Sequence, residues 1–244
     1  MSAAASRVDR QPAFVLHRRA WRETSLLLEL LTRDFGRVGV VARGARGGRR
    51  GLAASCQPFQ PLLASWSGRT DLKTLGAAEA VAPAPAIAGE RHYSALYVNE
   101  LLVRLLPPHD AHSALFGAYA ALLPGLAAAE DLEPLLRSFE LLLLRELGYG
   151  MEFVHDSATG QVLEPAGHYL FSPDGGFHAA PEASDPRAYP GWALAQIGRE
   201  DFSEPRTRRY AKRLMRQALA ELLGPRPLHS RGYFRRAPAP ADGI

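Results

Sequence analysis

The chain has 244 residues, 47% of them hydrophobic and 22% charged, which is the composition of a globular protein with one large or two modest domains. A single cysteine, Cys56, excludes an intramolecular disulfide bond and fits a reducing compartment. The N-terminus lacks the apolar core of a signal peptide, and no run approaches the roughly 18 apolar residues of a membrane span, so we expect a cytoplasmic protein without membrane contact.

The charge is distributed unevenly along the chain. The formal net charge is +4, but arginines crowd both ends, whereas the segment from Gly76 to Pro165 is acidic. Lysine is nearly absent, so almost every cation is a guanidinium group. Two basic modules that flank an acidic one indicate more than one contact with a polyanion, or a single composite surface.

Residues 14–50 predict strands of a small, curved sheet. Three short apolar runs alternate with charged turns, and runs of this length fit strands better than helices. The sequence Arg-Asp-Phe-Gly at 33–36 predicts a hairpin turn, because Asp and Gly tolerate the backbone angles of a tight reversal. Further strands at 59–65 and 71–75 complete five strand candidates, which favour a small barrel.

An arginine- and glycine-rich segment follows the third apolar run. Its glycines let a phosphate approach the backbone, and its guanidinium groups can bind that phosphate through paired hydrogen bonds. A basic loop at the edge of a small barrel is a common way to bind a nucleic-acid backbone. The arginines are Arg43, Arg46, Arg49 and Arg50. The aromatic residues that could stack on bases, or pack in the core instead, are Trp21, Phe35 and Trp66.

The middle of the chain predicts a linker and a bundle of helices. Residues 80–89, AVAPAPAIAG, form the linker, because their prolines block a helix and no charge interrupts them. From Glu90 the apolar residues recur at the helical period. Helices are predicted from Glu90 to just before Pro107, from 113 to a stop at Pro124, and from 134 to 147, and they should pack as a bundle.

Residues 151–182 break the helical pattern. His168–Ser172 and Phe177–Ala180 bracket the sequence Pro-Asp-Gly-Gly, which is a strong hairpin signal. His155, His168, His178 and Asp156 could bind zinc in principle, but their spacing matches no standard site. We therefore expect no metal and no cofactor.

The last predicted helix runs from Pro205 to Leu223, where Gly224 and Pro225 end it. Cations crowd its first half, where they oppose the helix macrodipole and cost stability. This cost favours a functional role, and a solvated face is the alternative. The cations in this cluster that we expect to contact a polyanion are Arg208, Arg209, Lys212 and Arg213. Residues 237–244 are expected to be disordered.

Five segments, taken in order, resemble the RecO family of bacterial recombination mediators. They are Phe14–Arg46, Gln57–Leu62, Tyr97–Leu102, Arg137–Tyr149 and Pro227–Arg231, and the resemblance runs from about residue 13 to about residue 236. It implies an α+β fold with an N-terminal OB-fold β-barrel at 1–79, the linker at 80–89, and an α-helical domain at 90–236. Many relatives carry a four-cysteine zinc site across 151–182, but no cysteine stands there in this chain. The resemblance thus implies a small, degenerate, zinc-finger-like hairpin insertion.

The resemblance also implies a function. RecO-like proteins bind single- and double-stranded DNA and anneal complementary strands without ATP. They engage the acidic C-terminal tail of the single-strand-binding protein SSB and, with RecR, help RecA to displace SSB. From the distribution of charge in this sequence, we expect the DNA contacts to be Arg37, Arg43, Arg46, Arg49 and Arg50, followed by Lys73 and the cluster Arg208, Arg209, Lys212 and Arg213. Arg137, beside Leu136 and Phe139, is the candidate contact for the SSB tail.

The sequence offers no set of enzymatic residues. It contains no GxxxxGK[ST] phosphate loop, and neither Cys56 nor the His109–His112 segment has a catalytic partner at a suitable spacing. We therefore expect a binding protein and not an enzyme. The alternatives are a metal-dependent nucleic-acid enzyme at the histidines and a regulatory module that binds RNA or DNA with the same barrel.

Overall fold

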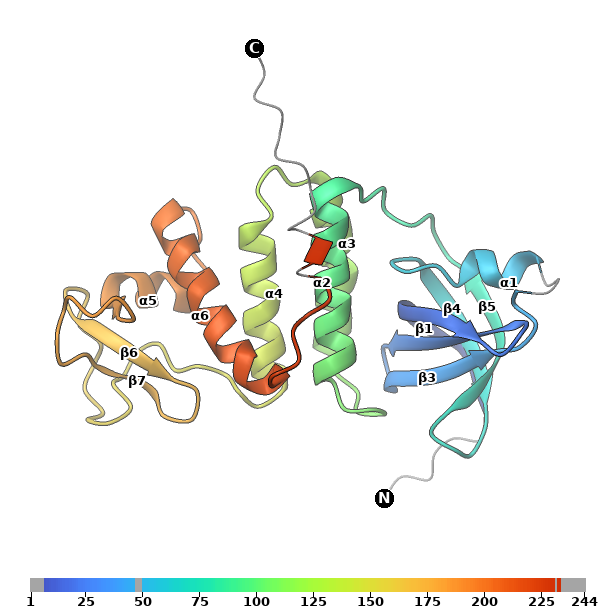
Figure 1. Ribbon diagram of the computed structural model, residues 1–244, viewed down its shortest axis with the longest axis horizontal. Helices are drawn as coiled ribbons and strands as arrows, with labels where there is room; N and C mark the ends of the chain where they lie inside the picture. Colours follow the sequence, from blue (N-terminus) through green and yellow to red (C-terminus); the bar gives the residue numbers. More distant parts are fainter. Residues whose placement is uncertain (1–6, 47–49, 231, 234–244) are drawn as a thin grey trace, which may run out of the picture. The chain divides into compact units, whose positions relative to one another are not determined.

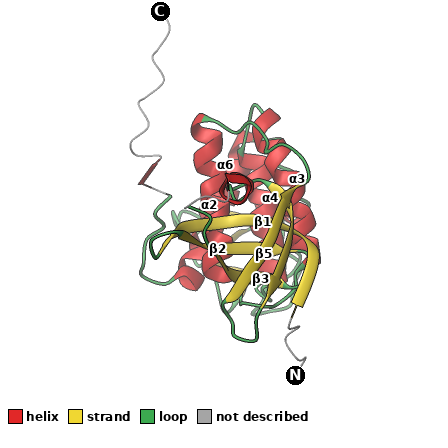
Figure 2. Ribbon diagram, turned by 90° about the vertical axis from the view of Figure 1, so that its right-hand side faces the viewer, coloured by secondary structure: helices red, strands yellow, loops and turns green. Residues whose placement is uncertain are grey.

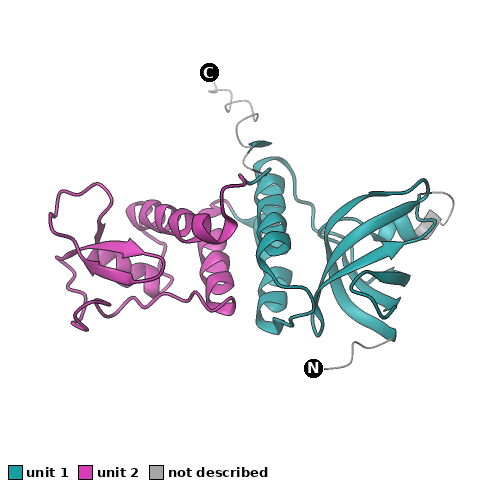
Figure 3. Cartoon of the chain, turned by 60° about the horizontal axis from the view of Figure 1, so that its bottom comes forward, with its two compact units in different colours: residues 1–129, 228–244 teal, residues 130–227 magenta. Residues whose placement is uncertain are grey.

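The computed structural model describes residues 7–46, 50–230 and 232–233, and for residues 50 and 51 it describes the backbone alone (Figure 1). The described chain divides into two compact units (Figure 3). Unit 1 comprises residues 1–129 and 228–244, and unit 2 comprises residues 130–227. The helices at Gly89–Leu105 and Ser113–Ala128 thus belong to the same compact unit as the barrel. The boundary at 80–89 stays a prediction about the organisation of the sequence.

Unit 1 begins with a five-stranded barrel. Its strands are β1 (Arg7–Trp21), β2 (Ser25–Thr32), β3 (Gly36–Ala42), β4 (Pro61–Ser67) and β5 (Lys73–Ala80), and the helix α1 (Arg50–Ser55) lies between β3 and β4 in the chain. The strands pair in the closed order β1-β2-β3-β5-β4, and of these pairings only that of β3 with β5 is parallel. Figure 2 shows the strands of the barrel in yellow. This five-stranded arrangement is that of an OB-fold, so the predicted barrel is confirmed.

The barrel closes because β1 is long enough to pair with two strands. Its first half pairs with β4 and its second half pairs with β2. Irregularities between Val8 and Gln11, and between Val15 and His17, interrupt the two registers. Such irregularities bend a strand and increase its twist, which lets one strand curve from one neighbour to the next.

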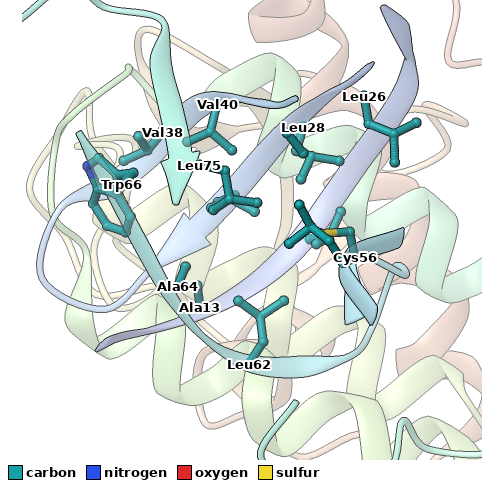
Figure 4. Packing of buried hydrophobic residues seen from close by; sticks show 14 of the residues in the cluster. Ala13, Leu26, Leu28, Val38, Val40, Cys56, Leu62, Ala64, Trp66 and Leu75 are labelled. Atoms are coloured by element: carbon teal, nitrogen blue, oxygen red, sulfur yellow. The ribbon is translucent and has the colours of Figure 1, made fainter. Parts of the chain in front are cut away.

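The barrel interior is filled by the alternating apolar residues of the predicted strands. In β3 the side chains of Val38, Val40 and Ala42 are fully buried, as period-two alternation requires. Figure 4 shows Val38 and Val40 among the packed core residues. Trp66 belongs to the same core and meets Phe35 edge to face at 5.6 Å between ring centroids. Of the three aromatic residues considered for stacking on bases, these two therefore pack in the fold.

Two helices complete unit 1, α2 (Gly89–Leu105) and α3 (Ser113–Ala128). The prediction that the second helix stops at Pro124 is wrong, because α3 continues to Ala128. A proline so close to the end removes one backbone hydrogen bond, and the fully buried Leu126 holds the last turn by packing.

Unit 2 contains three helices and a small sheet. The helices are α4 (Glu133–Glu146), α5 (Gly191–Gly198) and α6 (Pro205–Leu223), and the strands are β6 (His168–Ser172), β7 (Gly176–Ala179) and β8 (Tyr189–Pro190), in the sheet order β7-β6-β8. The predicted hairpin is β6 and β7, which pair antiparallel. The predicted α+β fold class, with a helical part that carries a small hairpin insertion, is thus confirmed.

A single carboxylate organises the insertion. Asp156 accepts hydrogen bonds from the backbone N–H groups of Ala158 and Thr159 in its own turn and of Ala179 at the end of β7, at 2.8–3.0 Å. Among the residues that the structure describes, no three His, Cys, Asp or Glu side chains come together as metal ligands. Within the same residues, no helix is long and apolar enough to cross a membrane.

Candidate nucleic-acid interface

The turn between β1 and β2 lies beside the segment that follows β3. The N–H of Arg46 donates to the carbonyl of Thr24 at 2.8 Å, and its guanidinium group reaches the carbonyl of Arg22 at 3.5 Å. The pairing of Leu26 with Ala42 fixes this neighbourhood, because it places the start of β2 against the end of β3. One end of the barrel therefore joins two basic segments of the sequence.

Five arginines meet at this end of the barrel, and all five are exposed. We call them the barrel-end arginines: Arg18, Arg19, Arg22, Arg43 and Arg46. Among the described residues, none of them forms an ion pair with a carboxylate. A cluster of exposed guanidinium groups without counter-charges attracts a polyanion, and each group can bind a phosphate in a bidentate manner.

An aromatic ring accompanies the cluster. The guanidinium carbon of Arg19 lies 5.6 Å from the ring centroid of the half-buried Trp21 at the end of β1. Trp21 is thus the one aromatic residue of the three considered that lies among the arginines. Sequence reasoning missed Arg18, Arg19 and Arg22 as site residues, although the sequence Arg-Arg-Ala-Trp-Arg places three cations and one ring within five positions.

Two of the residues predicted to contact DNA are largely buried within unit 1. Arg37 donates to Glu29 at 2.7 Å and to the carbonyl of Leu106 at 3.0 Å, and 17% of its side chain is exposed. Lys73 is 4% exposed and lies on the same inner face of β5 as the buried Leu75. Arg49 and the side chain of Arg50 lie outside the part of the chain that the structure describes.

Three of the four cations of the predicted α6 cluster pair with other groups of unit 2. Arg208 pairs with Asp131 at 3.3 Å, and Lys212 pairs with Glu133 at 2.5 Å. Arg213 donates to the carbonyls of Pro186 and Ala188. Of the four predicted cations, only Arg209 is exposed.

The candidate contact for the SSB tail is buried. Arg137 is 5% exposed and pairs with Glu140 at 2.9 Å. The Nε of Arg137 also lies 3.8 Å from a carboxylate oxygen of Glu133. The next residue, Ser138, lines a cleft of about 340 Å³. Its lining includes the apolar residues Leu135 and Phe202, Arg208, and the carboxylates of Asp131 and Glu200.

The lone cysteine is not a nucleophile in this fold. Cys56 is fully buried in the barrel core. Burial raises the pKa of its thiol to about 11, and the positive charge of Arg18 offsets only part of this effect. Because the thiolate is the reactive form, the thiol is inert near neutral pH. The arrangement of the described residues thus supports binding of a polyanion.

Comparison with known proteins identifies the family. The N-terminal model of recombination protein O matches residues 7–84, and the C-terminal model of the same protein matches residues 88–232. The chain belongs to the RecO family. It is 47% identical to the DNA repair protein RecO of Methylococcus capsulatus over 94% of both chains. It is 44% identical to the DNA repair protein RecO of Cellvibrio japonicus over 93% of this chain and 97% of that relative.

Several segments that carry the RecO resemblance hold the fold together. In the Gln57–Leu62 segment, Phe59 has a φ of +66° and is buried against His92 of α2, with ring centroids 5.4 Å apart. In the Tyr97–Leu102 segment, Asn99 bonds to the backbone of β1. The RecO signature therefore marks contacts within the units, and the exposed arginines must be found from the geometry.

Proposed function

We propose that this RecO-family chain is a DNA repair and recombination mediator that binds the phosphate backbone of DNA with the barrel-end arginines. The observation that supports the proposal most directly is the set of five exposed arginines, which pair with no carboxylate among the described residues and of which Arg19 lies over Trp21. The DNA repair proteins to which the chain is 44–47% identical support the same role. Arg37 and Lys73 shape the barrel in this proposal, and Arg49 and Arg50 remain candidate contacts.

The proposed activity is annealing of complementary strands without ATP. Two strands that approach each other repel through their phosphates, and a guanidinium group that neutralises a phosphate removes part of this repulsion. Binding also releases condensed counterions, which favours the complex at low salt. The chain itself needs no cofactor for either effect, because both follow from charge.

The proposed partners are single- and double-stranded DNA, the acidic C-terminal tail of SSB, RecR and, through them, RecA. Contact between Arg137 and the tail requires the ion pair of Arg137 with Glu140 to open, because both side chains are buried. Binding of an SSB tail peptide should then weaken in Arg137→Ala and stay unchanged in Arg145→Ala, which alters an exposed arginine of the same helix.

The decisive experiment measures annealing of complementary oligonucleotides coated with SSB, without nucleotide and with a chelator present. The chain should accelerate annealing, and the double variant Arg43→Ala/Arg46→Ala should lose most of the acceleration. The plot of log binding constant against log salt concentration for duplex DNA has a negative slope. In the double variant this slope should become less steep by about 1.8, since each lost phosphate contact contributes about 0.9. Arg69→Ala, an exposed arginine between β4 and β5, is the control and should leave both quantities unchanged.

Three outcomes would contradict the proposal. Unchanged affinity and salt slope in the double variant would remove the barrel-end arginines from the DNA site. Strand degradation after metal is restored would favour a metal-dependent nuclease. Preferential binding of RNA oligonucleotides in competition with DNA would favour a regulatory RNA-binding module.

A further inference from the structure

The helix α6 carries four arginines on one face. Arg206, Arg209, Arg213 and Arg216 follow each other at intervals of three, four and three residues, which places them in one row along a helix. We call this row the α6 stripe. The residues that α6 buries, among them Ala211, Leu214 and Ala218, lie on the opposite side of the helix.

The α6 stripe is not neutralised by its own helix. The first acidic residue of α6 is Glu221, beyond the end of the row. Arg208 and Lys212 lie on another face of the helix. Arg208 forms an ion pair with Asp131, and Lys212 forms one with Glu133. Like charges at intervals of three and four residues destabilise a helix, so a row of this kind costs stability unless a bound anion offsets it.

Aromatic rings alternate with these arginines. The guanidinium carbon of Arg206 lies 5.2 Å from the ring centroid of Trp192 in α5, and Trp192 meets Tyr210 edge to face at 5.8 Å. The guanidinium carbon of Arg213 lies 4.0 Å from the ring centroid of Tyr189 and 5.3 Å from that of Tyr210. Trp192 and Tyr210 are half-buried, so part of each residue is accessible from solvent.

The three exposed members of the stripe are Arg206, Arg209 and Arg216. Arg213 has a different role, because its two terminal nitrogens donate to the carbonyls of Pro186 and Ala188. It fixes the rings of Tyr189 and Tyr210 beneath the stripe. The surface thus combines exposed guanidinium groups, which can bind phosphates, with fixed rings, on which bases can stack.

We propose that Trp192 and the exposed arginines Arg206, Arg209 and Arg216 form a second nucleic-acid site that takes single-stranded DNA by stacking a base on Trp192. The inference rests on the proposed function, which it extends from one site to two. Single strands fit better than a duplex, because a duplex keeps its bases stacked inside and offers only its phosphates to the rings. An acidic peptide supplies carboxylates but no planar base.

A second site has a consequence for annealing. Each of the two units carries its own cluster of exposed arginines, so one chain can hold two strands at once. Base stacking on aromatic side chains tolerates every sequence, because each base has a π-face. A site of this kind suits a protein that must hold any strand before the strand finds its complement.

The first test measures the fluorescence of Trp192, taken as the difference between the parent chain and Trp192→Phe. A saturating oligo-dT should quench this difference signal, and inorganic polyphosphate of matched charge should not, because it has no bases. No change with oligo-dT, or equal quenching by polyphosphate, would overturn the stacking site. Trp192→Ala should weaken binding of single-stranded oligo-dT by at least about 5-fold and leave duplex binding unchanged.

The second test separates this inference from the proposed function by counting short oligo-dT molecules bound per chain. The parent should bind two, and Arg206→Ala/Arg209→Ala/Arg216→Ala and the barrel variant Arg43→Ala/Arg46→Ala should each bind one. Two oligonucleotides on the α6 variant would overturn the second site and leave the barrel site standing. No binding by the parent would overturn the proposed function itself.

Two controls keep the second test interpretable. Arg145→Ala removes an exposed arginine from α4 of the same unit, so it reports the effect of charge alone and should leave two oligonucleotides bound. The single variant Arg209→Ala alters one exposed side chain and repeats the test with the smallest change to the helix. Arg209→Ala should bind the second oligonucleotide more weakly than Arg145→Ala does, and equal binding by these two variants would contradict the inference.

Discussion

Asn99 shows how one buried polar residue joins three elements of unit 1. Its amide donates to the carbonyl of Leu16 in β1 at 2.8 Å and accepts from the hydroxyl of Tyr119 in α3 at 2.6 Å. Phe14 packs against Tyr119 on the same side, with ring centroids 5.1 Å apart. A buried network of this kind fixes one arrangement of strand and helices, because every other arrangement leaves a polar group without a partner.

Replacing Asn99 by Leu should therefore destabilise the chain strongly. The substitution keeps the approximate volume but leaves the Leu16 carbonyl and the Tyr119 hydroxyl buried without partners. The expected loss is roughly 2–4 kcal/mol of unfolding free energy, measured by urea denaturation. Tyr119→Phe removes one of the two hydrogen bonds and should lose less. A variant Asn99→Leu as stable as the parent would show that the network does not stabilise the fold.

At the scale of elements, the loop between α2 and α3 lies against the turn between β2 and β3. The N–H of His109 donates to the carbonyl of Arg37 at 2.9 Å, and Arg37 donates back to Leu106. Gly36 permits this approach, because a β-carbon there would lie 1.9 Å from the carbonyl oxygen of Asp110. The hairpin glycine that the sequence predicted thus also serves the contact between barrel and loop.

Gly36→Ala should disrupt that contact. Gly44→Ala is the matched control, because Gly44 has a φ of +68° against +63° for Gly36, but has open space around it. The control should lose about 1–2 kcal/mol from backbone strain alone. Gly36→Ala should lose roughly 2 kcal/mol more, because the loop must also move. Equal unfolding free energies for the two variants in urea would show that the close approach carries no cost.

The insertion in unit 2 is the second element whose stability depends on one residue. Burial raises the pKa of the Asp156 carboxyl, but the three backbone N–H donors together outweigh this effect and lower it. The folded pKa therefore lies below the unfolded value of about 3.9. The contribution of the carboxylate to stability is complete above the unfolded pKa and is lost as the pH falls through the folded pKa.

Asp156→Asn should loosen the insertion without unfolding unit 2. Hydrogen exchange of the amides of Ala158, Thr159 and Ala179, corrected for intrinsic rates, should accelerate at least about tenfold at pH 7, which corresponds to about 1.4 kcal/mol. In the parent the same amides should lose protection as the pH falls below about 4, whereas the variant should change little. Asp174→Asn, in the exposed hairpin turn, is the control. Unchanged protection in Asp156→Asn would contradict the role of the carboxylate.

At the scale of the whole molecule, the sequence predicted the elements better than the site. The apolar patterns of strands and helices are local, so they predicted the barrel, the hairpin and most helices. The pairing of cations depends on which carboxylates tertiary packing brings close, and no local pattern shows it. Arg208 and Lys212 looked like neighbours of Arg209 on one basic helix, yet Arg208 pairs with Asp131, just before α4, and Lys212 pairs with Glu133, at the start of α4. The sequence did not indicate the exposed arginines of β1 as site residues, because the fold brings them close to Arg43 and Arg46, which follow β3 in the chain.

The chain leaves unit 1 after residue 129 and returns to it at residue 228, and Glu100 of α2 holds the returning segment. Its carboxylate accepts the backbone N–H groups of His229 and Ser230, both at 2.8 Å. Beyond them, Tyr233 stacks on Tyr93 of α2 with ring centroids 5.6 Å apart. The carboxylate of Glu100 thus ties the returning segment to α2.

Glu100→Ala should release this segment while both units stay folded. Chymotrypsin should then cleave after Leu228 and Tyr233 faster than in the parent, by about tenfold or more, because two charge-assisted hydrogen bonds hold the backbone there. Glu90→Ala, at an exposed position in the first turn of the same helix, should cleave at the parental rate. Equal rates in Glu100→Ala and the parent would show that packing of the buried Leu228 holds the segment without the carboxylate. Faster cleavage in Glu100→Ala alone would assign the return of the chain to unit 1 to this one side chain.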